Sequence, residues 1–190
     1  MLNLWDELPD ALVVDGKSYF LHTDFRHWMQ IESLIYEEDM PFTGKISRVL
    51  SLAYSVLPPS LEVALYGLIT FYVVGSDGIK CSKRTESARQ RSYSFTHDAA
   101  LIYAAFMQEY GLDLHKENLH WWQFCSLFRG LSDRTRFVKI AGYRLMNTAQ
   151  IQDAGYRQFV CRMKALYALP DLRSEAEKEE MLATSLEALF

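Results

Sequence analysis

The stretch that decides the fold is residues 110–131, which read YGLDLHKENLHWWQFCSLFRGL. Gly111 follows an apolar-periodic segment that ends at Tyr110, and a glycine at this place indicates the left-handed stop of a helix. Beyond it, large apolar groups stand on nearly every side of one short helix. Because a helix that is apolar all round has to be buried, we expect this one to be the hub of a helical core. Its central side chains are Trp121, Trp122, Phe124 and Phe128.

The two adjacent indoles of this hub are expected to have different neighbours. Consecutive residues on a helix diverge by roughly 100°, so Trp121 and Trp122 should pack against two different helices. A buried indole N–H also needs a hydrogen-bond acceptor. The nearest acceptors in the sequence are His120 and Asp113.

The overall composition indicates a well-packed globular domain. The chain has 190 residues, of which 49% are hydrophobic and 14% aromatic, so it can fold without a disulfide or a metal. A net charge of −4, spread along the chain, predicts neither a nucleic-acid nor a membrane partner. Three cysteines without a C-x-x-C pair favour a reducing compartment. No signal peptide is recognisable, so we expect a cytoplasmic protein.

The N-terminal half predicts a β-hairpin followed by three helices. Residues 11–21 contain two β-prone runs around Asp15-Gly16, the pair that a type I′ turn requires. Helices are expected over residues 25–36, 45–56 and 60–74. The last contains the longest apolar run, 63–74, which at twelve residues is shorter than the roughly 20 that span a bilayer. We therefore interpret it as a buried helix.

The C-terminal half predicts further amphipathic helices. Thr96 is expected to cap a helix that ends at Tyr110, and Ser132 to cap a helix over 134–145. Residues 156–167 have apolar side chains at spacings of three and four, with basic residues facing away. Together the patterns predict a mainly α fold. It is a single-domain bundle of about seven or eight helices, residues 1–170, with a small N-terminal hairpin.

Residues 171–190 follow Pro170 and are expected to form a last amphipathic helix. A capping box over 174–177 opens it, and its apolar side ends on the final residue. This helix either docks on the body or acts as an interaction arm that places its apolar stripe in a partner's groove. The candidate partner-binding residues are Met181, Leu182, Leu186, Leu189 and Phe190.

Residues 79–94 are basic and lack apolar periodicity. They indicate a surface loop, and a solvated linker is favoured over a site that binds a phosphate backbone. For the second alternative the cationic side chains would be Lys80, Lys83, Arg84, Arg89 and Arg91.

Motifs that would indicate catalysis or metal binding are not recognisable in the sequence. It contains no phosphate loop, dinucleotide-binding turn, nucleophile elbow or zinc-binding helix. His22 and His27, like His115 and His120, are five residues apart rather than the four that direct two imidazoles at one ion. Cys125 lies in the apolar hub and is expected to be inert. We therefore expect a protein that is not an enzyme and needs no metal or cofactor.

Several motifs resemble one family of tailed phages. The run LHWWQFCSLFRGLSDRTRFVKIAGYR, residues 119–144, resembles the bacteriophage gene product fifteen family, which carries an HWW-x-F helix and a later helix ending in Tyr-Arg. The matching pair here is Tyr143-Arg144. The hairpin, the T-D-F-R-x-W start of the first helix at 23–28 and the closing Y-A-L-P at 167–170 are similar as well.

The resemblance implies a small, non-enzymatic protein of tail morphogenesis in the cytoplasm of the bacterial host. It implies a tail assembly chaperone that binds the tape-measure protein, the tail-tube protein or both, and it leaves self-association open. Two other classes remain: a structural virion protein at a tail or head–tail joint, and, less favoured, a nucleic-acid-binding phage regulator.

Overall fold

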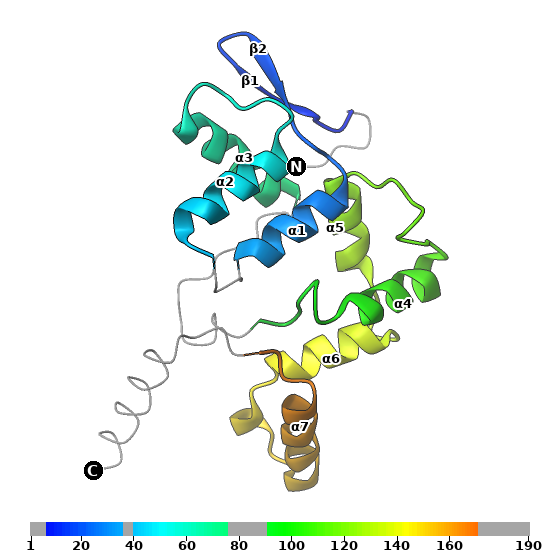
Figure 1. Cartoon of the computed structure of the whole chain (residues 1–190). Helices are drawn as coiled ribbons and strands as arrows, with labels where there is room; N and C mark the ends of the chain where they lie inside the picture. Colours follow the sequence, from blue (N-terminus) through cyan, green and yellow to red (C-terminus); the bar gives the residue numbers. More distant parts are fainter. Residues whose placement is uncertain (1–6, 36–39, 76–90, 171–190) are drawn as a thin grey trace, which may run out of the picture.

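A computed structural model describes residues 7–35, 40–75 and 91–170 of the chain (Figure 1). As expected, the described part is mainly α-helical with one small antiparallel hairpin. The hairpin and the last helix lie at opposite ends of the molecule (Figure 1). The elements are β1 (Ala11–Val14), β2 (Lys17–Phe20), α1 (Phe25–Ile35), α2 (Phe42–Ala53), α3 (Leu61–Gly75), α4 (Ala99–Tyr110), α5 (Trp121–Gly130), α6 (Arg136–Leu145), the short 3₁₀ turn η2 (Thr148–Gln150) and α7 (Ala154–Leu166).

The hairpin has the predicted turn. Asp15 and Gly16 have φ angles of 49° and 75°, the positive values that a type I′ turn needs. The strands pair with Leu12 opposite Tyr19. Leu12 rests on α3 at Gly67, where a Cβ atom would collide with the leucine side chain. The glycine therefore permits the close approach that fixes the hairpin to the helical body.

Helix α5 lies at the centre of an aromatic core. Phe124 is fully buried, and its ring stacks on Phe25 of α1 at 4.8 Å and on Phe106 of α4 at 5.2 Å. Trp121 is 2% exposed and stacks on Trp28 of α1 at 6.1 Å. Trp122 and Phe128 are only half-buried, and the helix is not covered on all sides, because its polar positions Gln123 and Arg129 face solvent.

Both indoles of α5 reach α3. Trp121 stacks on Tyr72 at 5.6 Å, and the Trp122 ring lies 5.4 Å from that of Phe71. The Trp122 indole N–H donates to the Phe71 carbonyl oxygen at 2.9 Å. In the described part of the chain, the buried Trp121 indole N–H has no acceptor.

The expectation that His120 and Asp113 accept these indole protons was wrong. His120 is the N-cap of α5, and its Nδ1 accepts the backbone N–H of Trp122 at 3.0 Å. Burial lowers the pKa of His120 and so favours the neutral ring that this cap requires. Asp113 instead forms an ion pair with Lys116 at 3.2 Å.

Two other predicted caps were misplaced. The N-cap of α4 is Asp98 rather than Thr96, and the N-cap of α6 is Thr135 rather than Ser132. The Ser132 hydroxyl donates to the Glu109 carboxylate at 2.9 Å, which is a longer-range contact that local pattern does not reveal. The predicted stop at Gly111 is confirmed by its left-handed φ of 66°.

None of the helices in the described ranges combines the length and apolar character needed to cross a bilayer. Residues 171–190, and residues 79–90 of the basic segment 79–94, lie outside the described residues.

Candidate functional site

The outer side of α3 is an exposed apolar surface. The inner side packs into the core through Ala64, Leu68 and Phe71. On the outer side Tyr66 is 70% exposed and Ile69 is 56% exposed. The expectation that this apolar run is a buried helix was therefore wrong for one of its faces.

The exposed side chains of α3 form a defined face. Tyr66, Ile69 and Val73 are three and four residues apart, so they line one side of the helix. The hairpin presents a second exposed apolar face, because its register directs Val13 and Phe20 to the side opposite Leu12. Contiguous exposed apolar surface on a folded protein marks an interaction site. We call the side chains of Leu61, Tyr66, Ile69 and Val73 the α3 face.

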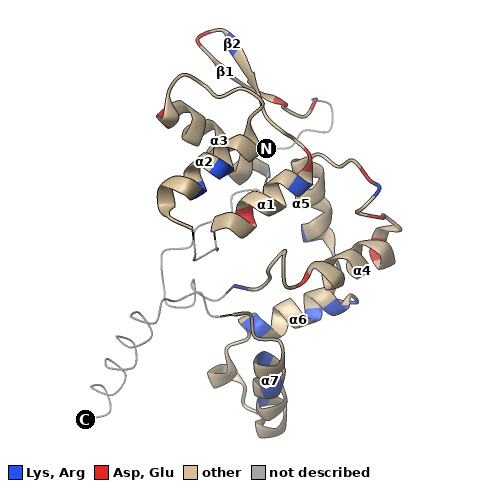
Figure 2. Cartoon of the chain, in the orientation of Figure 1, with Lys and Arg blue, Asp and Glu red and all other residues tan. Residues whose placement is uncertain are grey.

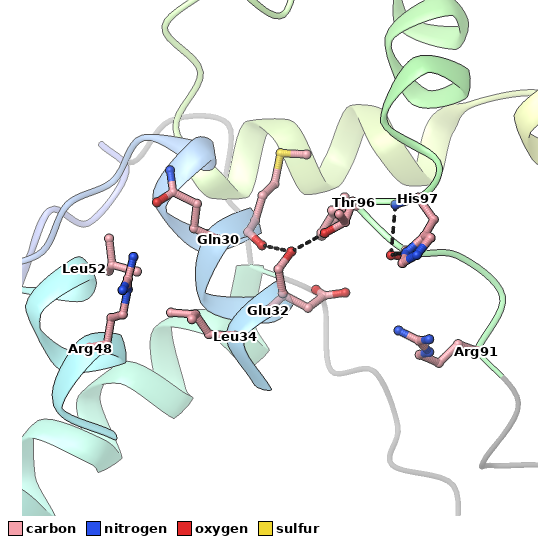
Figure 3. A pocket seen from close by; sticks show the side chains of 12 residues that line it. Gln30, Glu32, Leu34, Arg48, Leu52, Arg91, Thr96 and His97 are labelled. Carbon is pink, nitrogen blue, oxygen red and sulfur yellow. Dashed lines mark hydrogen bonds between the residues drawn. The ribbon is translucent and has the colours of Figure 1, made fainter. Parts of the chain in front are cut away.

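A cavity of about 590 Å³ lies between α1, α2 and the segment 91–97 (Figure 3). Glu32 of α1 is 8% exposed and borders it, and the side chains of Arg48 and Arg91 approach from two sides (Figure 3). Burial raises the pKa of the Glu32 carboxyl, while a hydrogen bond from the Tyr72 hydroxyl at 2.7 Å lowers it. The lining is a mixture of charged, hydroxyl and apolar groups.

The reactive side chains near this cavity are not arranged as a hydrolytic triad. The Ser94 hydroxyl meets His97 Nδ1 at 3.2 Å. The nearby carboxylate of Asp98, however, pairs with Arg144 instead of orienting the imidazole. Burial raises the pKa of the Cys125 thiol to about 12, which disfavours a nucleophilic thiolate there.

The helices α6 and α7 lie against each other at the end of the molecule opposite the hairpin (Figure 1). Near one end of the pair, Arg136 donates to the Tyr167 hydroxyl at 3.2 Å. Further along, the rings of Tyr143 and Phe159 meet edge-on at 5.7 Å. Val160 is the buried side chain of α7. We call residues 134–170 the α6–α7 unit.

A buried ion pair joins this unit to the body. Arg144 donates to both Asp98 carboxylate oxygens, at 2.6 and 2.9 Å, and both side chains are almost fully buried. The same guanidinium donates to the carbonyl oxygens of Ser92 and Tyr167. Lys164 then donates to the carbonyl oxygens of Arg144 and Met146 at the end of α6. These polar contacts connect Ser92 and Asp98, which precede α4, with the C-terminal ends of α6 and α7.

The α6–α7 unit is strongly basic. It has seven Lys and Arg side chains and one acidic residue, Asp153, in a chain whose total charge is −4. Figure 2 shows in blue the Lys and Arg positions along α6 and α7. The basic residues are Arg134, Arg136, Lys139, Arg144, Arg157, Arg162 and Lys164.

The structure describes the predicted hub residues, but it describes only one of the predicted partner-binding and phosphate-binding residues. The hub residues of α5 lie in or against the core. The candidate arm residues at 181–190 lie outside the described residues, as do four of the five cationic side chains proposed for phosphate binding. The fifth, Arg91, donates to the Pro170 carbonyl oxygen at 3.1 Å.

Of the two histidine pairs considered in the sequence, His22 and His27 lie against each other in the structure. His22 and His27 stack on each other at 4.9 Å, and the described residues contain no group of three or more His, Cys, Asp or Glu side chains placed to hold an ion. The α3 face was missed by sequence reasoning. A helix that is apolar all round gives no sign of which side remains uncovered.

Comparison with known proteins assigns the chain to a family. A family model described as "Bacteriophage Gp15 protein" matches residues 4–169, which is most of the chain. Neither a curated protein nor a solved structure matches it. The chain therefore belongs to the bacteriophage Gp15 family, which indicates a phage structural or morphogenesis protein.

Proposed function

We propose that this protein is a tail assembly chaperone that binds the tape-measure protein, the tail-tube protein or both during tail morphogenesis. The observation that supports the proposal is the α3 face. Tyr66, Ile69 and Val73 present apolar surface on one side of a helix whose other side is fixed in the core. A rigid apolar face of this kind suits the apolar stripe of an amphipathic partner helix.

What such a chaperone has to bind is consistent with an apolar surface of this kind. A chaperone for long apolar helices has to cover them until other subunits replace it. Apolar contacts are non-directional, so one face can accept successive stripes of different sequence. None of the four side chains of the α3 face is charged, and Glu62 is the one charged residue of the α3 sequence, which favours this kind of tolerance over specific recognition.

The test is co-expression with the tape-measure protein of the same phage, followed by pull-down and size-exclusion chromatography. The wild-type chain is expected to keep the partner soluble and to be absent from finished virions. The double variant Tyr66→Ser, Ile69→Ser should weaken the complex about tenfold or more, because exposed aromatic anchors dominate such interfaces. Its fold should be retained, since both side chains are largely exposed.

The matched control removes equivalent apolar groups elsewhere. Val13→Ser with Phe20→Ser strips the outer face of the hairpin, where the two side chains are 66% and 55% exposed. This control should bind as the wild type does. Equal loss in both double variants would contradict a specific α3 site. A chain that leaves the partner insoluble and copurifies with virions would instead be a structural tail protein.

A further inference from the structure

One exposed side of α7 carries apolar side chains that are bordered by positive charge. Phe159 and Leu166 belong to the same stripe as the buried Val160, yet they are 36% and 65% exposed. Arg162 lies three residues after Phe159 and four before Leu166, so it borders the exposed edge of the stripe. Leu166 and part of the Phe159 ring therefore remain exposed at this side of α7.

Helix α6 contributes a second cation. Tyr143 of α6 meets the Phe159 ring edge-on. Lys139 is exposed and lies one turn before Tyr143 on the same side of α6. We call the strip formed by Phe159 and Leu166, with Lys139 and Arg162 at its edges, the α7 strip. A complementary partner would combine an apolar stripe with flanking acidic groups.

The basic residues of the unit suit a protein partner better than a nucleic acid. Arg144 is buried in its pair with Asp98, and Lys164 is held by two carbonyl oxygens of α6. Arg136 donates to the hydroxyl of Tyr167. Cations that are already engaged contribute little to the counterion release that drives phosphate binding. The exposed Leu166 would gain nothing from a phosphate backbone.

A segment with the complementary chemistry follows directly in the sequence. Residues 171–190 contain six acidic and two basic side chains, and their apolar residues recur at helical spacing. This segment begins after Pro170, whose carbonyl oxygen accepts a hydrogen bond from Arg91. The chain therefore leaves α7 with Pro170 held at Arg91.

We propose that residues 174–190 of this chain dock on its own α7 strip, antiparallel to α7. Helix α7 ends at Leu166, so the connection to residue 174 is about seven residues long. This length is within the roughly two to eight residues that usually connect neighbouring helices. A helix of 17 residues would be about 25 Å long, against about 20 Å for α7, so it can cover the whole strip. The acidic groups would face Lys139 and Arg162, and the apolar stripe would cover Phe159 and Leu166.

The first test is zero-length carbodiimide cross-linking of the full chain, followed by peptide mass spectrometry. The expected product joins Lys139 to a glutamate between 175 and 187 within a monomer. The ion pair Lys116–Asp113, whose charged atoms are 3.2 Å apart, provides an internal positive control. If Lys116–Asp113 cross-links and Lys139 joins no tail glutamate, the proposal is wrong. Products found only in dimers would also overturn it and would place the segment on a second copy.

The second test uses hydrogen exchange of the peptide covering residues 154–166 in full-length variants. Arg162→Glu should increase exchange there by about two- to fivefold, the range expected for loss of an exposed ion pair. Arg134→Glu reverses an exposed charge away from the strip and should leave this exchange unchanged. Leu166→Ser should act like Arg162→Glu, whereas Leu145→Ser, at another exposed leucine, should not.

The nucleic-acid alternative has its own outcome. If the full chain binds a DNA duplex at 50 mM salt and Arg162→Glu abolishes that binding, the strip is occupied by phosphate and the docking proposal fails. If both Arg162→Glu and Arg134→Glu leave exchange over 154–166 at the wild-type level, nothing covers the strip and the proposal fails equally. Neither result bears on the α3 face, so the two proposals can fail separately.

Discussion

The core around α5 and helix α7 are held in place in different ways, whereas α6 belongs to the core through Phe137, whose ring lies 5.2 Å from that of Phe128. In the core, the fully buried ring of Phe124 lies between rings from α1 and α4. Helix α7 buries one side chain, Val160, and its C-terminal end is held by the polar contacts of Arg144 and Lys164. Apolar burial supplies most of the stability of a fold. A polar junction fixes orientation with less net stability. The two regions should therefore respond differently to substitution.

The largest difference is expected from removing one aromatic ring in each region. Phe124→Ala should lower the free energy of unfolding by about 3–5 kcal/mol, because it leaves a cavity between stacked rings. Phe159→Ala on α7 should cost about 1 kcal/mol or less, since that ring is 36% exposed. Urea unfolding followed by circular dichroism measures both values. Equal losses would show that the two regions do not differ as proposed.

The junction itself should be sensitive to an unpaired charge. Arg144→Met would leave the Asp98 carboxylate buried without its cation and should lower the free energy of unfolding by about 3 kcal/mol. Adding Asp98→Asn to Arg144→Met should restore part of this loss, because no buried charge then remains. If the double variant were as unstable as Arg144→Met, the junction would be stabilised by the hydrogen bonds of Arg144 to carbonyl oxygens and not by its charge.

The core contains a buried acid that should make its stability depend on pH. Burial raises the pKa of Glu32 above its ordinary 4.5 more than the Tyr72 hydrogen bond lowers it. The folded state therefore holds this proton more tightly than the unfolded chain does. The resulting stability is fully present below pH 4.5 and is lost as the pH rises through the folded-state pKa.

The variant Glu32→Gln tests this dependence, because glutamine resembles the protonated acid. Its free energy of unfolding relative to the wild type should grow as the pH rises from 4 toward 7. Tyr72→Phe removes the hydrogen bond to the carboxylate and should steepen the dependence. Urea unfolding at several pH values measures both. A difference between wild type and Glu32→Gln that is constant with pH would contradict the assignment.

Local patterns predicted the elements better than the contacts between them. The Asp15-Gly16 turn and the Gly111 stop were predictable, because each depends on the φ angle of a single residue. The caps of α4 and α6 were not, since the predicted caps Thr96 and Ser132 form hydrogen bonds with Ser33 and Glu109, which are distant in sequence. The exposed α3 face was missed for a related reason. Which side of an apolar helix stays uncovered is decided by neighbours that sequence periodicity does not identify.

The smallest effect is expected at the N-cap of α7. Asp153 accepts the backbone N–H of Tyr156 at 2.6 Å, and Asp153→Ala should cost the helix about 1 kcal/mol. Because α7 is joined to the body by a few polar contacts, this loss should appear as faster hydrogen exchange in 154–166, with exchange in α5 unchanged. Asp133→Ala, which removes an exposed acid that is not a cap, is the control. If Asp153→Ala accelerated exchange in α5 to the same degree, α7 would unfold together with the core, and the contrast between the two regions would disappear.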